Sequence, residues 1–166
     1  MIQNIPLPAT HEPADAAFWQ ATLRAELVVQ QCTGCGHHRF PPRPMCPVCQ
    51  STALQWRTMS GRGTIWSFAV PRPPLLPAFE ALLPYVTAVV ELEEDPLLRV
   101  TGALLDPHTG SMQGVSAESV AIGAPVQIAF WRCAEDVALP CWQLVGAGSK
   151  AGVLSGIAAS PSGENA

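Results

Sequence analysis

Apolar positions recur at helical spacing near the start of the chain. The series runs from Ala14 to Ala25, and Pro13 suits the first turn of a helix. This pattern predicts a helix over residues 13–25, preceded by an extended arm. Arm and helix together make a first unit, residues 1–26.

Beyond residue 58 the apolar pattern becomes that of short β-strands. Segments rich in Val, Ile and aromatic residues alternate with Gly, Pro and acidic turns. The predicted strands cover residues 64–70, 85–92, 98–105, 126–131 and 142–145. Because no helix-length segment separates them, they predict a small antiparallel barrel of five strands over residues 58–145.

The last part of the chain, residues 146–166, is rich in Gly, Ser and Ala and holds two charges, Lys150 and Glu164. This composition predicts a flexible tail, or one that a partner holds in place.

Charged residues interrupt every apolar stretch, because the longest runs without Asp, Glu, Lys or Arg have 13 residues. A membrane-spanning helix needs about 18 to 20. The first basic residue is Arg24, so the N-terminus lacks a secretory signal pattern. We therefore expect a soluble cytoplasmic protein with reduced cysteines and no membrane partner.

The net charge of −4 conceals an asymmetry along the chain. Residues 21–75 hold six arginines and one acid, a net charge of +5, and the remainder carries −9. One interpretation is simply an uneven surface. The other is a local site for a phosphate-bearing ligand, since arginine makes planar contacts with phosphate.

Two cysteine pairs give the strongest chemical signal. Cys32 and Cys35 form one Cys-x-x-Cys pair, and Cys46 and Cys49 form a second after a spacer of ten residues. Two such turns can aim four thiolates at one point and so build a closed tetrahedral metal site. The sequence therefore predicts a metal-binding ribbon over residues 27–57.

The expected metal is structural zinc, because a closed set of four thiolates leaves no open position for a substrate water. One iron in a rubredoxin-like electron-transfer site is the alternative that spacing leaves open. Free or disulfide-bonded cysteines are disfavoured by the doubled spacing and by a reducing compartment.

The remaining thiols and imidazoles give weaker signals. Cys133 and Cys141 lack the paired spacing and lie beside apolar strands, which predicts buried thiols. His37 and His38 fall in the ribbon loop, where four better ligands are already present, and are interpreted as exposed loop residues.

No catalytic constellation stands out. The acidic run at residues 91–95 precedes a proline and is interpreted as a solvated hairpin turn. Gly61 and Gly63 resemble part of a nucleotide loop, but a β-prone segment follows them instead of a helix. They are interpreted as a bulge or bend in a strand.

The connection between the first two predicted strands, residues 71–84, contains five prolines and yet is too apolar for an ordinary loop. Its apolar side chains either cap the barrel or dock on a partner. The candidate docking residues are Leu75, Leu76, Phe79 and Leu82.

Several motifs in order resemble one known family. They are Phe18-Trp19, Cys32-Thr33-Gly34-Cys35-Gly36, Phe40-Pro41-Pro42-Arg43, Cys46-Pro47-Val48-Cys49, Gly61-Arg62-Gly63-Thr64-Ile65, Arg99-Val100-Thr101-Gly102 and Leu139-Pro140-Cys141-Trp142. In combination they resemble the acyl-CoA-associated zinc-ribbon/OB-fold proteins over about residues 12–145.

The resemblance implies a mainly β fold, with an N-terminal helix, a rubredoxin-like zinc ribbon and an OB barrel. It also implies an accessory subunit that accompanies thiolases, thiolase-like aldolases or hot-dog-fold hydratases acting on acyl-CoA. The family has no agreed catalytic residues, so only the four cysteine ligands carry over to this sequence.

The leading hypothesis is therefore a non-catalytic subunit of a hetero-oligomer with a thiolase-type or hydratase enzyme, supporting acyl-CoA binding or turnover. The resemblance supplies acyl-CoA as the possible ligand, and the arginine-rich region supplies its location. Arg43 and Arg62 are the candidate contacts to the CoA phosphates.

Two alternatives remain open. An OB barrel can bind oligonucleotides, with Trp66, Phe68 and Tyr85 as stacking surfaces, but a net charge of −4 and a single lysine disfavour nucleic acid as a partner. The other alternative is the one-iron electron carrier.

Overall fold

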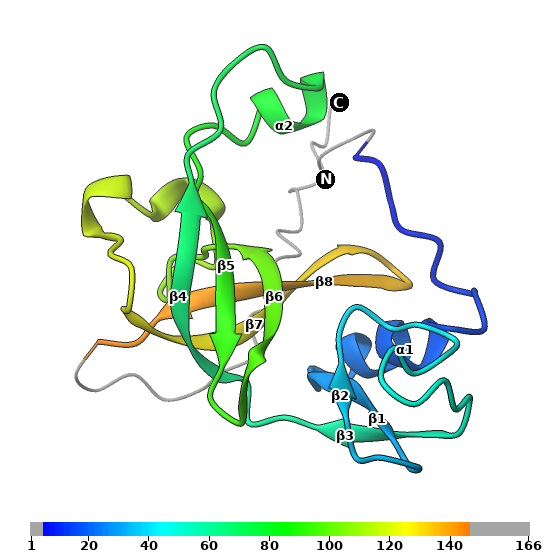
Figure 1. The fold of residues 1–166 in the computed structure, drawn as a ribbon. Coiled ribbons are helices and arrows are strands. Elements are labelled where there is room, and N and C mark those ends of the chain that lie inside the picture. Colours follow the sequence, from blue (N-terminus) through cyan, green and yellow to red (C-terminus); the bar gives the residue numbers. More distant parts are fainter. Residues whose placement is uncertain (1–4, 147–166) are drawn as a thin grey trace, which may run out of the picture.

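A computed structural model describes residues 5–146 as a helix, a small ribbon and a curled five-stranded sheet (Figure 1). The helix α1 spans Ala16–Leu23, and the ribbon strands are β1 (Val28–Cys32), β2 (His38–Arg39) and β3 (Leu54–Thr58). The barrel strands are β4 (Arg62–Ala69), β5 (Thr87–Leu92), β6 (Asp95–Ala103), β7 (Pro125–Ala134) and β8 (Val137–Leu144). Helix α2 (Pro77–Glu80) follows β4, and two short 3-10 helices, Met112–Gly114 and Ala117–Ser119, follow β6. The tail predicted at residues 146–166 lies outside the described residues from residue 147 onward.

Helix α1 is shorter than the predicted helix over residues 13–25. Its end is set by Ala25, which has a φ of +59° and lets the Glu26 amide donate to the Ala21 carbonyl at 3.0 Å. A left-handed residue with this bond closes a helix, usually with glycine in its place. Alanine gives no such signal in sequence, so the prediction ran too far.

The five barrel strands form one antiparallel sheet in the order β6-β5-β4-β7-β8. The sheet curls until its two end strands meet, where Leu104 and Trp142 form a parallel bridge and the Leu105 amide donates to the Trp142 carbonyl at 2.7 Å. The predicted five-stranded OB architecture is therefore confirmed.

Strand β8 begins at Val137, five residues before the strand predicted over residues 142–145. Pro140 lies inside it, opposite Phe130 of β7. Proline lacks a backbone donor and is depleted in strands, so it concealed the first half of this strand in the sequence.

The two glycines beside Arg62 lie where the first barrel strand begins, as predicted. Gly61 has a φ of +71°, and the strand pairing shifts by a bulge between Ile65 and Ser67. The positive φ of Gly61 fits the expected bend, whereas the bulge lies further along the strand, beside Trp66, which has 47% of its surface exposed.

Gly102 lies where β6 crosses β8. A Cβ built on it would lie 2.5 Å from the Pro140 carbonyl oxygen and 3.1 Å from the Cα of Cys141. Both neighbours are backbone atoms, which cannot move aside as a flexible side chain can.

Replacing Gly102 with alanine is therefore expected to lower the free energy of unfolding by about 1 to 3 kcal/mol, the usual range for overpacking. Urea unfolding of the zinc-loaded chain measures this. Gly146→Ala is the matched control, because a Cβ there has no neighbour within 4 Å. Equal stability of both variants would contradict the close crossing of the two strands.

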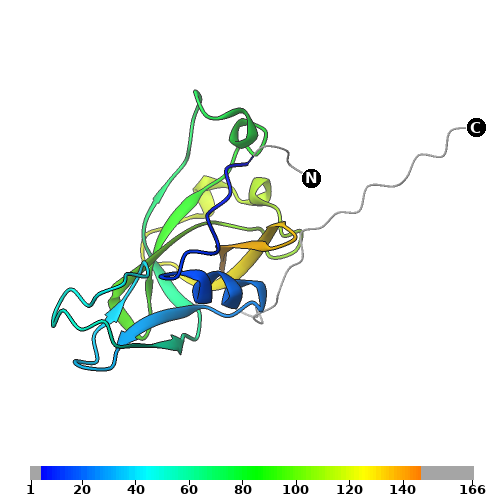
Figure 2. The ribbon, with the colours of Figure 1, turned by 90° about the vertical axis from the view of Figure 1, so that its right-hand side faces the viewer.

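One hydrophobic core extends through all three parts. Phe18 of α1, Val29 of β1 and Trp142 of β8 belong to the same buried cluster. A smaller cluster of Leu82, Leu105, Met112, Ala129 and Cys141 lies at the α2 end, where Ile5 of the N-terminal arm packs against it. Figure 2 shows this arm running from the α2 end towards α1. Within residues 5–146, no helix has the length and hydrophobicity that crossing a membrane requires.

Candidate metal centre and binding residues

The four predicted ligands converge at the tip of the ribbon. Their sulfur atoms all lie within 4.8 Å of one another. The Cys32 and Cys49 sulfurs are 3.5 Å apart, and those of Cys35 and Cys46 are 3.7 Å apart. Sulfurs bound tetrahedrally to one zinc at about 2.3 Å would be about 3.8 Å apart. The cluster therefore fits a structural zinc ion.

The two cysteine turns are closed by the same type of backbone hydrogen bond. In the first, the Gly36 amide donates to the Cys32 carbonyl at 2.9 Å, and in the second the Gln50 amide donates to the Cys46 carbonyl at 2.9 Å. Gly36 has a φ of +78° and Gln50 a φ of +60°. Glycine signals this conformation in sequence. Glutamine does not, so the matching turn after the second pair was missed.

Backbone amides donate hydrogen bonds to the sulfurs of Cys32 and Cys46, the first cysteine of each pair, and favour their ionised forms. The bond from the Cys49 amide is the largest cause that lowers the pKa of Cys46 to about 6, and that from the Cys35 amide is the largest that lowers the pKa of Cys32. At Cys35 the His37 amide acts in the same direction, but the neighbouring sulfurs and burial raise its pKa to about 12.

Crowding of the sulfurs therefore disfavours the thiolate form of Cys35. A dication would allow all four sulfurs to be thiolates at once. Because protons compete with the metal for these sulfurs, metal affinity falls as the pH falls.

A buried glutamine holds the ribbon loop in place. The Gln30 Oε1 atom accepts hydrogen bonds from Arg39 Nε at 2.6 Å and from the Arg43 backbone amide at 2.9 Å. Its Nε2 donates to the Ala14 carbonyl at 3.1 Å, just before α1. Sequence patterns do not reveal this role, because glutamine in a short β-prone run is usually exposed.

The six arginines of residues 21–75 do not form one exposed patch. Arg39 is buried, with 4% of its surface exposed, and Arg24 pairs with Glu26. The two predicted phosphate ligands lie on different parts of the fold. Arg43 is exposed on the ribbon loop, whereas Arg62 begins β4 and forms an ion pair with Glu93.

His38 departs from its predicted role as an exposed loop residue. It lies on β2, is half-buried, and places its Nδ1 3.4 Å from Asp95 Oδ2 at the start of β6. This contact links the ribbon to the barrel. No local pattern indicates this contact, because the two residues are brought together only when both parts have folded.

The apolar side chains of residues 71–84 fall into two groups, those that cap the barrel and those that are exposed. Leu82 is buried and Phe79 packs on the same small cluster, so these two side chains cap the barrel. Gln113 anchors the segment by donating to the Ala81 and Leu83 carbonyls, both at 3.1 Å.

Leu75 is half-buried, and Leu76 leaves 56% of its surface exposed. Of the four candidate docking residues, Leu76 is therefore the one that is free to contact a partner.

The aromatic residues considered for base stacking do not share a surface. Trp66 is exposed, but the Arg99 guanidinium lies 3.9 Å from the centre of its ring. Phe68 packs against the main core, and Tyr85 packs on the small cluster at the α2 end. This arrangement gives no support to the nucleic-acid interpretation.

The other two thiols are separate from the metal centre. Cys141 is buried, which raises its pKa to about 12, as expected for an inert core thiol. Cys133 is only half-buried, so the prediction of a buried thiol holds less well there.

Comparison with known proteins agrees with this architecture. The ChsH2 rubredoxin-like zinc ribbon domain matches residues 19–55, and the ChsH2 C-terminal OB-fold domain matches residues 56–131. A DUF35 domain-containing scaffold protein from Methanothermobacter thermautotrophicus is 34% identical over 114 residues, which are 68% of this chain and 77% of that protein. The chain belongs to the ChsH2/DUF35 family. This confirms the resemblance found in the sequence.

One of the relatives is a longer protein. A probable enoyl-CoA hydratase alpha subunit from Thermomonospora curvata is 36% identical over 141 residues, covering 83% of this chain and 39% of that protein. The chain thus spans about two fifths of that relative. Among solved structures, the Ltp2-ChsH2(DUF35) aldolase matches with a TM-score of 0.70 and 30% identity, over 83% of this chain and 98% of the matched chain.

Proposed function

We propose that this chain is a non-catalytic scaffold subunit that binds a thiolase-like aldolase or a hydratase and supports acyl-CoA binding. The observation that carries the proposal is the match to 98% of a ChsH2(DUF35) chain from an aldolase. The same ribbon and barrel also match about two fifths of a hydratase alpha subunit. One unit found with both enzymes is explained most simply by a shared accessory role.

The chemistry of the described residues supports a role without catalysis. The four thiolates form a closed set that leaves no open coordination position. The contact of His38 with Asp95 joins the ribbon to the barrel. Relatives named for acyl-CoA hydratases supply the ligand class, including a 3-oxo-4,17-pregnadiene-20-carboxyl-CoA hydratase alpha subunit from Mycobacterium tuberculosis, 32% identical over 129 residues.

The proposal is tested by co-expressing the chain with a thiolase-like aldolase or hydratase subunit from the same organism. Gel filtration and light scattering measure the complex, and the partner's turnover of acyl-CoA is measured with and without the chain. We expect a stable complex, higher turnover in its presence and no turnover by the chain alone. Turnover by the isolated chain, or the absence of a complex with either enzyme class, would contradict the proposal.

Within this function, Arg43 is the stronger of the two candidate phosphate contacts. Its side chain is exposed, whereas Arg62 must first leave Glu93. Arg43→Ala is expected to weaken acyl-CoA binding by the complex about fivefold at low salt, equivalent to about 1 kcal/mol for a partly exposed charged contact. Arg62→Ala should have a smaller effect.

Isothermal titration of the complex with acyl-CoA measures these affinities. The matched control is Arg57→Ala, which removes an exposed arginine from β3. If Arg43→Ala and Arg57→Ala bind acyl-CoA equally well, the placement of the phosphates at the ribbon loop is wrong.

A further inference from the structure

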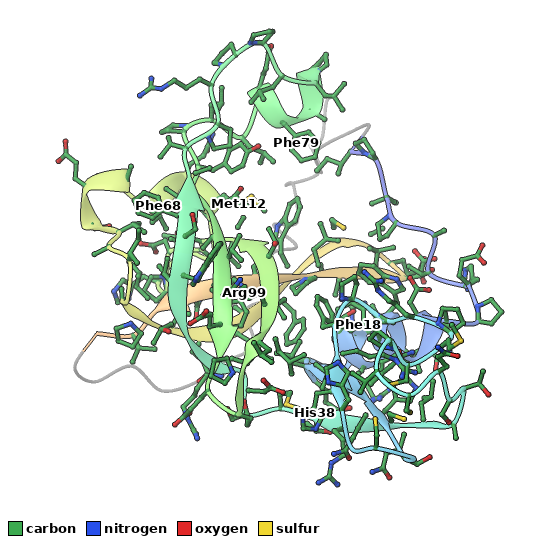
Figure 3. All side chains as sticks on the ribbon, viewed as in Figure 1. Phe18, His38, Phe68, Phe79, Arg99 and Met112 are labelled. Carbon is green, nitrogen blue, oxygen red and sulfur yellow. The ribbon has the colours of Figure 1, made fainter. Side chains whose placement is uncertain are left out.

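A cleft of about 570 Å³ lies where α1, the ribbon loop, the α2 end and the curled sheet meet. Sites for small ligands are typically about 300 to 1,000 Å³ in volume and mostly apolar. Five half-buried aromatic side chains from separate parts of the chain line this cleft: Trp19, Phe40, Phe79, Tyr85 and Trp131. Figure 3 shows Phe18 on the α1 side, Phe79 and Met112 on the α2 side, and Arg99 on the sheet.

The polar side chains that line this cleft are Asp15, Thr87, Arg99 and Thr101. Asp15 Oδ2 accepts a hydrogen bond from Trp19 Nε1 at 3.1 Å. Arg99 is held on the sheet by Glu91, to which its Nη2 donates at 2.9 Å, and by the ring of Trp66. Its Nη1 makes no hydrogen bond within residues 5–146. Pro42 lines the cleft, but Arg43 does not. The cleft therefore combines a mostly apolar lining with one arginine, Arg99, and one carboxylate, Asp15.

A peptide strand is a poor occupant, because strand addition needs a free sheet edge. The floor of the cleft is where β6 crosses β8, and there Gly102 already lies against the Pro140 backbone. An apolar group needs no such hydrogen bonds. An anionic group attached to it would be attracted to Arg99.

We infer that this cleft binds the hydrocarbon part of an acyl group, with the charged end of its carrier facing Arg99. The inference rests on the proposed function, which supplies acyl-CoA as the ligand class. It adds that the subunit itself contacts the acyl chain, through the aromatic lining, rather than only the carrier. The ligand is held without chemistry, since no bond is formed or broken.

The test is titration of the full zinc-loaded chain with saturated acyl-CoA esters of increasing length, and with free CoA. Trp19 and Trp131 line the cleft, so tryptophan fluorescence reports its occupation. Each added methylene should raise the affinity about two- to fourfold until the cleft is filled. Free CoA should bind at least about tenfold more weakly than the longest ester that fits.

Ala103→Phe tests the location, because Ala103 lines the cleft and a larger side chain would fill it. It should reduce acyl-CoA affinity to that of free CoA. The matched control is Leu97→Phe on the same strand, outside the cleft and 81% exposed, which should bind as the unchanged chain does. If Ala103→Phe does not fold, Leu139→Ala enlarges the cleft instead and should move the plateau to longer chains.

Affinity that does not depend on chain length, or an Ala103→Phe variant that binds acyl-CoA normally, overturns the inference. An Ala103→Phe variant that still binds acyl-CoA but no longer joins its enzyme partner also overturns it, because the cleft would then hold a side chain of the partner. The two proposals fail separately. If the protein joins its enzyme but its affinity does not depend on acyl length, only the acyl cleft is refuted. If its affinity depends on acyl length but it joins no enzyme, only the scaffold role is refuted.

Discussion

Replacing Cys35 with serine is expected to abolish metal binding and unfold the ribbon. Its sulfur lies 3.7 Å from that of Cys46 in a cluster of four, and a hydroxyl is a poor substitute for a thiolate on zinc. Structural zinc sites contribute about 10 to 16 kcal/mol of apparent binding free energy in small zinc domains, and this energy is folding energy. The metal content should fall from about one zinc per chain to almost none.

Elemental analysis of the purified chain measures the metal, and hydrogen exchange measures the ribbon. Amides of β1 and β3 should lose protection, because these strands meet beside the cysteine turns. Cys133→Ser is the matched control, since that thiol lies outside the cluster. Full zinc occupancy in Cys35→Ser would refute the site, and one bound iron in the unchanged chain would favour the electron-carrier alternative.

The metal centre was predictable because its signal is local. Each pair of cysteines is separated by two residues, and one tight turn brings both sulfurs together. Nothing distant is needed to place them except the pairing of β1 with β3. Spacing alone therefore sufficed, even though the second turn depends on a glutamine instead of a glycine.

The supporting contacts were not predictable, because they join residues that are far apart in the chain. Gln30 connects α1 to the ribbon loop, and His38 meets Asp95 across 57 positions. Each residue type is common on protein surfaces, so neither stands out from its neighbours. The role of Gln30 depends on how the segment before α1 packs on the ribbon, and that of His38 on how the ribbon packs on the barrel. No local pattern encodes either arrangement.

The barrel was predictable in part. Segments rich in Val, Ile and aromatic residues between turn residues predicted all five strands, but Pro140 concealed the start of β8, which contributes to the lining of the cleft. The cleft itself was not foreseen. Its aromatic residues are spread from Trp19 to Trp131, and only the curl of the sheet brings them together.

Replacing Leu76 with serine is expected to weaken association with the enzyme partner at least about tenfold, which is about 1.4 kcal/mol. Leu76 is 56% exposed on a segment held rigid by prolines and by Gln113, so it would lose little entropy on docking. An exposed side chain contributes little to folding, so the isolated chain should stay within about 0.5 kcal/mol of its original stability. Gel filtration of the mixed subunits and thermal unfolding of the isolated chain measure the two quantities.

Leu82→Ala provides the contrast, because Leu82 is buried in the small cluster under the same segment. It should cost about 2 to 5 kcal/mol of stability, as buried leucines do. Leu97→Ser removes an exposed leucine elsewhere on the barrel and should change neither property. If Leu76→Ser joins the enzyme normally while Leu82→Ala is destabilised, the segment serves only to cap the barrel. Loss of the complex in Leu76→Ser but not in Leu97→Ser would instead assign the docking contact to this segment, because both substitutions remove an exposed leucine and Leu97 is the more exposed of the two.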